Sequence, residues 1–300
     1  MSSLCLRADE LSNLRARVTR LERENFRLRQ MVTMLSYMQK AQNGVERSVQ
    51  FGKRTVARLR VARHGWKGSR PEDVAAVCHS CAKSILEVIR PAEGRELSLV
   101  IVASKSGPMA LFQRGPSDEY LVLLNVGARA WAQLAYQFAH ELGHVMCEVL
   151  PGQPQHWFEE AFCESLSLWT LDRLGKSWKT DAPYPNWKSY AKHLSSYSND
   201  VRKRSKSPKD LSNWFATHKK HLTRQAYDRD KNLIVAVQLA ERAHQNADFY
   251  RAFYHMRDRK SKPSTDSMKA VLTDWVSRAP KKLQFAPKEI AKLLGIPLSK

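Results

Sequence analysis

The chain has 300 residues, 43% of them hydrophobic, and its 50 Lys and Arg outnumber its 29 Asp and Glu, for a formal net charge of +21. This length and apolar content exclude a disordered chain and allow one large or two modest folded domains. No run approaches the ~18 apolar residues of a membrane span, and five sparse cysteines without a secretory signal indicate reduced thiols, so we expect a cytoplasmic protein with no membrane partner.

A heptad repeat runs through the first forty residues. Mostly aliphatic side chains occupy its core positions: Leu4, Leu11, Val18, Asn25 and Val32 at a, and Leu14, Leu21, Leu28 and Leu35 at d. This pattern is typical of a parallel two-stranded coiled coil. In a parallel homodimer, the flanking g and e′ side chains have opposite charges in three pairs, Glu10–Arg15, Arg17–Glu22 and Glu24–Arg29. We expect residues 1–40 to form a dimerising coiled coil, paired through residues 4–38; the alternative is an amphipathic helix folded onto its own chain.

Basic residues dominate the next segment. Residues 51–71 carry seven Lys and Arg and no acid, and we predict a basic linker, or a short charged helix, at 41–70. Pro71, followed by two acids, favours the start of a helix that runs to residue 89. On this helix Cys78 and Cys81 continue an apolar face, and no second C-x-x-C pair exists, so we expect them to pack in the core.

Three strand-like runs follow at 97–103, 108–113 and 120–126. Two helices are predicted after them, at about 128–149 and 156–174. At 100° per residue, the apolar side chains of the first helix form one stripe, made of Trp131, Leu134, Ala135, Phe138, Leu142, Val145 and Val149.

The same helix contains the segment FAHELGH, residues 138–144. His140 and His144 lie opposite the apolar stripe and share one face, because residues four apart are one helical turn apart. Two imidazoles in this position can bind one metal ion.

The second helix supplies a third potential ligand. The first helix rises about six residues, ~9 Å, beyond His144, and prolines at 151 and 154 then turn the chain. An antiparallel return of similar length brings Glu160 level with His144. The alternatives for the third ligand are Glu159, Glu164 and His156. Three protein ligands would leave the fourth position of a zinc ion for water.

Two further carboxylates have different predicted roles. Glu141 cannot reach the same ion as its neighbours without distorting the helix, but it is placed to take a proton from a water molecule that zinc activates. Glu164 lies level with His140, and we expect it to accept the second ring N–H of that histidine and so fix its tautomer. The pattern therefore predicts one Zn²⁺ per chain and hydrolytic chemistry.

Beyond residue 175 the chain is predicted to be helical and basic, with a net charge of +16 from residue 171 to the end. Basic clusters at 203–206, 219–220 and 257–262 favour contact with nucleic acid or another polyanion. The alternative is a solvated surface, since neither a recognised nucleic-acid fold nor a basic helix of the bZIP type accompanies them.

The residues from 138 to 164 resemble the gluzincin metallopeptidases, the thermolysin-like and aminopeptidase-type zinc enzymes. In these enzymes H-E-x-x-H precedes a helix that carries a ligand Glu and an acidic residue four places on. WFEEAF (157–162) is similar to the aminopeptidase-type pattern W-L-N-E-G-F, although Glu159 and Ala161 replace Asn and Gly. Tyr227, which precedes a long apolar helix, is similar to the tyrosine of the family's Y-x-K-G segment. The likeness covers roughly 97–258.

The resemblance implies an α+β fold: a zincin-like core at 71–175, in which a small, mostly antiparallel sheet packs on two active-site helices, and a basic helical subdomain at 176–300. It implies the zinc ligands His140, His144 and Glu160. The same resemblance makes Glu141 the base and Tyr227 a hydrogen-bond donor to the oxyanion. By the usual arrangement of the family, YLVLLNV (120–126) is the edge strand that pairs with an extended peptide.

The chain departs from the aminopeptidase-type enzymes in one segment. Where they carry a Glu that grips the substrate's N-terminal amine, this chain reads Gly107-Pro-Met109, without an acid. We therefore predict a zinc-dependent peptidase, an endopeptidase in its action, with a protein or peptide substrate. The alternative is a basic coiled-coil protein associated with nucleic acid, in which the zincin fold is inactive or a scaffold.

Overall fold

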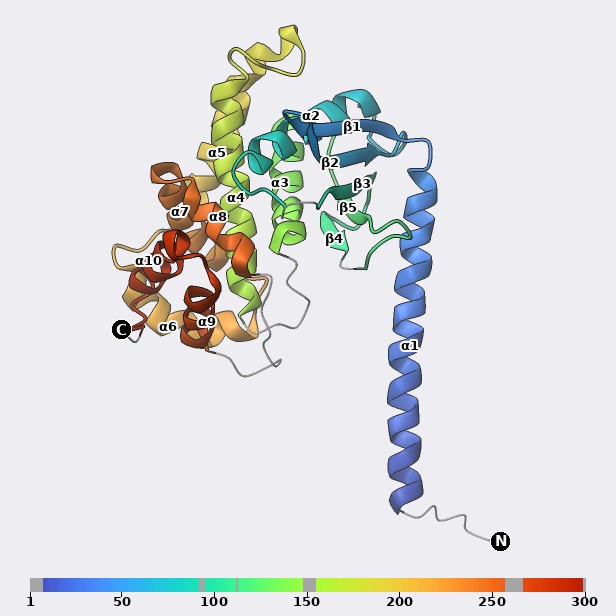
Figure 1. The fold of residues 1–300 in the computed structure, drawn as a ribbon, viewed down its shortest axis with the longest axis vertical. Coiled ribbons are helices and arrows are strands. Elements are labelled where there is room, and N and C mark those ends of the chain that lie inside the picture. Colours follow the sequence, from blue (N-terminus) through green and yellow to red (C-terminus); the bar gives the residue numbers. More distant parts are fainter. Residues whose placement is uncertain (1–7, 92–94, 112, 148–154, 257–266, 299–300) are drawn as a thin grey trace.

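The computed structural model describes residues 8–91, 95–111, 113–147, 155–256 and 267–298 (Figure 1). Three sequence predictions fall outside these ranges: the first heptad position at Leu4, the helix end and turn at 149–154, and the basic cluster at 257–262.

One five-stranded sheet organises the N-terminal half. Its strands lie in the order β1-β2-β3-β5-β4, with the bounds Val45–Phe51 (β1), Arg54–Val61 (β2), Leu97–Ala103 (β3), Met109–Leu111 (β4) and Tyr120–Leu124 (β5). The three central strands are parallel, and β1 and β4 are antiparallel to their neighbours. Helix α2 (Pro71–Leu86) makes the crossover that the parallel pair β2–β3 requires. The α+β class is confirmed, but the sheet is mixed, so the prediction of a mostly antiparallel sheet is wrong.

The basic linker predicted at 41–70 is also wrong, because residues 45–61 form the hairpin β1–β2. Along β2, Leu59 and Val61 are buried, whereas Arg58 is exposed. Arg60 lies 3.3 Å from the buried Glu119. Long arginine side chains reach solvent or an acid while their backbone stays in the sheet, so a high charge does not exclude a strand.

Strand β4 is the edge strand at one end of the sheet, so the prediction that the segment 120–126 forms the edge is wrong. β5 pairs with β3 on one side and with β4 on the other, and all its residues are buried. A continuous apolar run is typical of an interior strand, because both of its faces are covered. β4 pairs with β5 alone, and its Met109 is 48% exposed. An extended segment that joins this side of the sheet therefore has to pair with β4.

The sheet is covered on both faces. One face packs against α2 and α3 (Trp131–Cys147) with the side chains of Leu99, Ile101, Val122 and Leu124. The other face packs against the end of α1 (Ala8–Lys40) with Val100, Val102, Leu121 and Leu123. Successive residues of a strand point to opposite faces, so α1 and α3 lie on opposite sides of the sheet (Figure 1).

The C-terminal half is helical. Its elements are α4 (His156–Ser177), α5 (Ala191–Arg204), α6 (Leu211–Arg224), α7 (Arg229–Gln245), α8 (Asp248–Phe253), α9 (Met268–Arg278) and α10 (Phe285–Leu293), with 3₁₀ turns at Pro185–Tyr190, Tyr254–Met256 and Lys281–Leu283. The stacked rings of Phe162 on α4 and Phe253 on α8 have centroids 3.8 Å apart. One buried cluster extends from Val49 in the sheet to Leu294, so the sheet and these helices share a core.

The helices predicted at 71–89, 128–149 and 156–174 are confirmed as α2, α3 and α4 within the part of the chain that the structure describes. Cys78 and Cys81 are fully buried on α2, which confirms that they pack in the core. Burial raises the pKa of both thiols, so both keep their protons. None of the helices in the described ranges is both long and apolar enough to cross a lipid bilayer.

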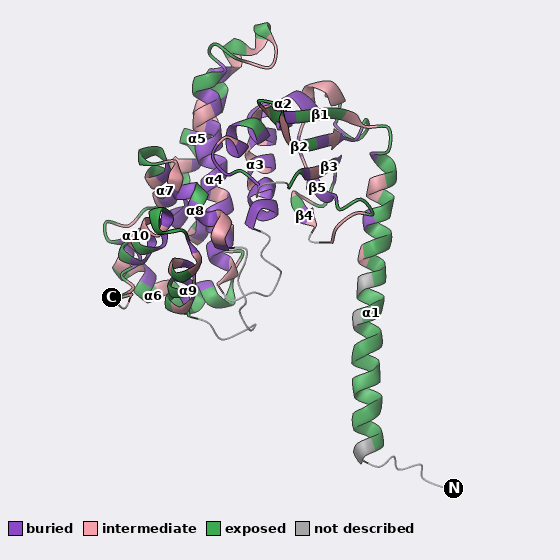
Figure 2. Ribbon diagram, in the orientation of Figure 1, coloured by how far each residue is buried: buried purple, intermediate pink, exposed green. Residues whose placement is uncertain are grey.

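Helix α1 extends away from the rest of the fold (Figure 1). It has 33 residues, of which those before the last two turns are almost all exposed (Figure 2). Its helical structure is confirmed for residues 8–40. Its pairing with a second chain stays a prediction.

Candidate metal centre

Helix α3 carries both histidines of the HELGH segment. Its predicted core stripe is confirmed over the described residues, where Trp131, Leu134, Ala135, Phe138, Leu142 and Val145 are all buried. The opposite face of α3 packs against α4. Gly143 permits this close approach, because a Cβ at that position would lie 2.8 Å from the Sγ atom of Cys163 on α4. The glycine therefore brings the histidines within reach of the side chains of α4.

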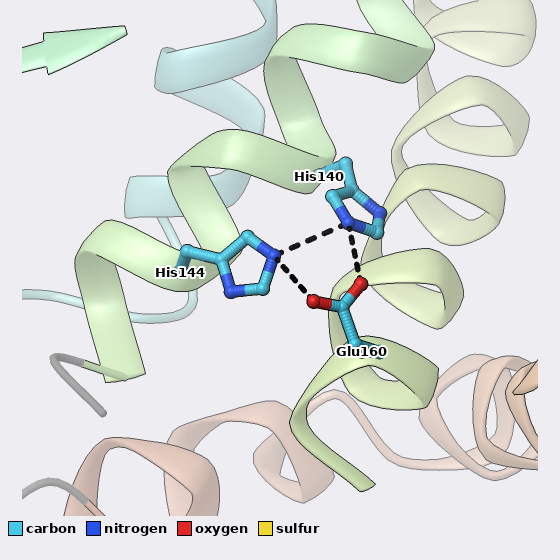
Figure 3. A group of neighbouring side chains, drawn as sticks. All are labelled: His140, His144 and Glu160. Atoms are coloured by element: carbon cyan, nitrogen blue, oxygen red, sulfur yellow. Dashed lines mark hydrogen bonds and ion pairs between the residues drawn. The ribbon is translucent and has the colours of Figure 1, made fainter. Parts of the chain in front are cut away.

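Three potential ligands converge between α3 and α4 (Figure 3). The Nε2 atoms of His140 and His144 are 3.2 Å apart. The carboxylate of Glu160 faces both rings, with Oε2 3.4 Å from His140 Nε2 and Oε1 3.6 Å from His144 Nε2. The ligand atoms of all three residues lie within 4.8 Å of one another. The antiparallel return predicted from the sequence thus brings Glu160 to the two histidines, while metal binding itself stays a prediction.

Glu159 lies behind His144 and is 1% exposed. His144 Nδ1 donates a hydrogen bond to Glu159 Oε1 at 2.8 Å. The other carboxylate oxygen lies 2.8 Å from His156 Nδ1, as an ion pair rather than an aligned hydrogen bond, and His156 Nε2 lies 3.4 Å from Glu160 Oε1. Glu159 therefore orients His144 so that Nε2 faces Glu160. The sequence had offered Glu159 and His156 as alternative ligands, and the structure places both beside the cluster.

Glu164 lies behind His140, where the sequence predicted it. One carboxylate oxygen is 3.5 Å from His140 Nδ1, and the other accepts a hydrogen bond from the hydroxyl of Tyr136. Burial, reinforced by the charge of Glu164, raises the pKa of Tyr136 well above its usual value, so the hydroxyl keeps the proton that it donates. Sequence reasoning missed Tyr136, although it lies four residues before His140, on the same face of the helix.

Glu141 connects α3 with the edge strand β4. It is 3% exposed, and its carboxylate accepts a hydrogen bond from the backbone N–H of Ala110 in β4. Burial raises the pKa of Glu141, although the neighbouring His140 and His144 and the Ala110 bond oppose this effect. A buried carboxylate with a raised pKa beside a potential metal ion is a candidate proton acceptor.

The carboxylates set the charge of the cluster. Burial by itself lowers the pKa of His140, but contacts with Glu160 and Glu164 outweigh it and raise the pKa to about 10. Burial likewise opposes the effect of Glu159 and Glu160 on His156, whose pKa rises to about 9. Although burial disfavours the charged form of Glu160, its histidine partners hold the pKa of this carboxyl well below its usual range. The carboxylates therefore favour positive charge at these histidines, as a proton or as a metal ion.

Tyr227 lies in the connection between α6 and α7, at the rim of the cluster. Its ring meets the ring of His156 edge to face, with centroids 5.4 Å apart, and it is 70% exposed. Partial burial and the nearby Glu160 and Glu159 raise the pKa of its phenol, so the hydroxyl is protonated at neutral pH and can donate a hydrogen bond. The structure brings Tyr227 to His156, while its role at an oxyanion stays a prediction.

His144, Glu159 and Cys163 form a second group whose ligand atoms lie within 4.8 Å of one another. All three are buried, and burial raises the pKa of the Cys163 thiol well above its usual value. A cation there would have to displace both the thiol proton and the hydrogen bond between His144 and Glu159. The group of His140, His144 and Glu160 keeps that bond, and the His140 ring and the Glu160 carboxylate are partly exposed, so it is the better site.

The donor set of this first group fits zinc. Two imidazole nitrogens and one carboxylate are the ligands of many catalytic zinc sites, and a carboxylate behind each imidazole is the usual support. No protein-family model matches the chain, and a search of curated proteins finds no match either. The inference of a metal site therefore depends on the geometry of the site.

Replacing Tyr136 by Phe is expected to weaken zinc binding by about 10-fold, because Glu164 loses the hydrogen bond that holds it against His140. Competition with a chromophoric chelator measures the dissociation constant. Tyr197, whose ring packs edge to face against Tyr136, supplies the matched control. Tyr197→Phe removes a neighbouring hydroxyl and should leave zinc binding unchanged; equal losses in both variants would remove the specific role of Tyr136.

Proposed function

We propose that the protein is a zinc-dependent peptidase that hydrolyses amide bonds in a protein or peptide substrate. His140, His144 and Glu160 would hold the zinc ion, and Glu141 would act as the general base. The observation that carries this proposal is the convergence of two Nε2 atoms and one carboxylate within 4.8 Å, beside the buried carboxylate of Glu141. The resemblance to gluzincin metallopeptidases supports the same set of roles.

Each side chain has a distinct task in the proposed reaction. A bound zinc ion lowers the pKa of a water molecule to ~7 and polarises a carbonyl group. Glu141 accepts the proton that the attacking water loses and delivers it to the leaving amine. Glu159 and Glu164 hold the two imidazoles by their Nδ1 atoms, which keeps both Nε2 atoms available. Tyr227, at the rim, would donate a hydrogen bond to the oxyanion.

Strand β4 supports a peptide as the substrate. The backbone of Ala110 interacts with the carboxylate of Glu141, so β4 lies beside the proposed base, and β5 pairs with only one edge of this strand. An extended peptide that pairs with the other edge would pass near Glu141. β4, at Met109–Leu111, offers no acidic side chain to grip an N-terminal amine, which supports endopeptidase action.

The alternative function, contact with nucleic acid, is supported only by the positive charge of the chain. The lysines and arginines at 203–204 and 219–220 are exposed, which supports electrostatic attraction to a polyanion. The geometry at His140, His144 and Glu160 therefore favours the peptidase.

Removal and replacement of the metal test the proposal. We expect the purified full-length chain to contain one zinc ion and to cleave members of a mixed peptide library, with products identified by mass spectrometry. Dialysis against a chelator should abolish cleavage, and added Zn²⁺ should restore it. Cleavage that persists in protein shown to be free of zinc would contradict the mechanism, as would a zinc-loaded protein that cleaves neither this library nor unfolded proteins.

A further inference from the structure

Most side chains of helix α1 are exposed to solvent among the described residues. The heptad side chains Leu11, Leu14, Val18, Leu21, Leu28, Val32 and Leu35 are 39–67% exposed. They form one continuous stripe, here called the seam, along a rod that extends ~50 Å at 1.5 Å per residue. An apolar surface of this length marks an interaction site, and an isolated helix gains little stability without a partner.

The seam faces away from the body of the protein. Where α1 reaches the sheet, it packs through Met34, Tyr37 and Met38, and Ala41 packs there directly after the helix. At 100° per residue, this face lies about 140° from the centre of the seam at Leu28, Val32 and Leu35. A partner on the seam therefore need not displace the packing of α1 against β3 and β5. The candidate metal centre is not obstructed either, because it lies beyond the other face of the sheet (Figure 1).

The charges beside the seam favour a second copy of this chain over an unrelated partner. In a parallel, in-register pair, three g side chains meet e′ side chains of opposite sign, and all six contributors are exposed: Glu10 with Arg15, Arg17 with Glu22, and Glu24 with Arg29. Asn25, at an exposed a position, meets its own copy only in this register. The surface is thus complementary to itself.

We propose that α1 pairs with α1 of a second copy as a parallel two-stranded coiled coil. Each α1 is joined to its own sheet at its C-terminal end. Parallel pairing therefore holds the two folded domains at the same end of the coiled coil. The faces that carry the two sheets point outward from the seam, so both metal centres stay open. This inference is independent of catalysis and concerns assembly alone.

Sedimentation equilibrium of the full-length protein tests the pairing. We expect twice the 34.4 kDa mass of one chain at micromolar concentration. Leu21→Glu combined with Leu28→Glu should weaken the dimer by at least about 100-fold, because pairing would bury charges. Phe26→Glu is the matched control, since Phe26 is 64% exposed but lies about 150° from the seam. A monomeric wild type, or a seam variant that remains as dimeric as the control, would overturn the proposal.

A cysteine placed at Leu14 distinguishes parallel from antiparallel pairing. In a Cys5→Ser background, Leu14→Cys should form a covalent dimer on mild oxidation, since d residues of parallel helices lie opposite one another. In an antiparallel pair the two thiols would lie about 30 Å apart and would not join. Circular dichroism of each variant establishes that the body remains folded, so loss of the dimer can be separated from unfolding.

Discussion

Replacing Glu141 by Gln is expected to lower kcat/KM by about 10²- to 10⁴-fold while the protein still binds one zinc ion. The amide keeps the size of the side chain, but it cannot accept a proton from the attacking water. Burial has already raised the pKa of Glu141, which brings its proton affinity closer to that needed for transfer at neutral pH. Zinc content and peptide cleavage, measured on the same preparation, separate the two functions.

Glu164→Gln provides the contrast for this prediction. Glu164 contacts Nδ1 of His140 rather than Nε2, the atom that faces Glu160, so replacing Glu164 should weaken zinc binding, and excess zinc should restore much of the activity. Excess zinc should not rescue Glu141→Gln. Wild-type turnover by zinc-loaded Glu141→Gln would exclude Glu141 as the base, whereas loss of zinc from this variant would show a structural role instead.

The main features of α3 can be predicted from residue order alone. A helix turns 100° per residue, so the apolar stripe and the shared face of His140 and His144 follow directly. The position of Glu160 along α4, opposite His144 on α3, also follows. The prolines at 151 and 154 require a turn, and two antiparallel helices rise equally per residue. The structure brings this carboxylate to both imidazoles.

The supporting contacts depend on quantities that the sequence does not contain. Whether Glu159 or Glu160 faces the two Nε2 atoms is decided by the rotation of α4 about its axis, and one residue changes this by 100°. The close approach at Gly143 and the aromatic contact of Phe162 with Phe253 set this rotation, and both depend on distant segments. The same limit applies to the sheet. Strand β5 follows β4 in the chain, yet it inserts between β4 and β3, so the edge strand that the family resemblance implied at 120–126 is wrong.

Replacing Glu160 by Ala is expected to weaken zinc binding by more than about 100-fold and to abolish peptide cleavage. Supporting carboxylates in zinc sites contribute 10- to 100-fold to affinity, and a direct ligand contributes more. The loss should leave the fold intact, because Glu160 is partly exposed and its partners are the imidazoles of the cluster rather than the core. Isothermal titration with Zn²⁺ measures the affinity, and thermal unfolding of the metal-free protein measures the stability.

Cys163→Ala is the decisive comparison, because the two candidate ligand groups share His144, and Cys163 belongs only to the second group whereas Glu160 belongs only to the first. If zinc lies between His140, His144 and Glu160, the cysteine variant binds the metal as the wild type does and loses only some stability from its buried position. The opposite pattern, with zinc retained by Glu160→Ala and lost by Cys163→Ala, would place the ion on the buried side of His144. There it would lie on the Nδ1 side of the His144 ring, away from the two Nε2 atoms, and a peptidase would no longer be the function that the site supports.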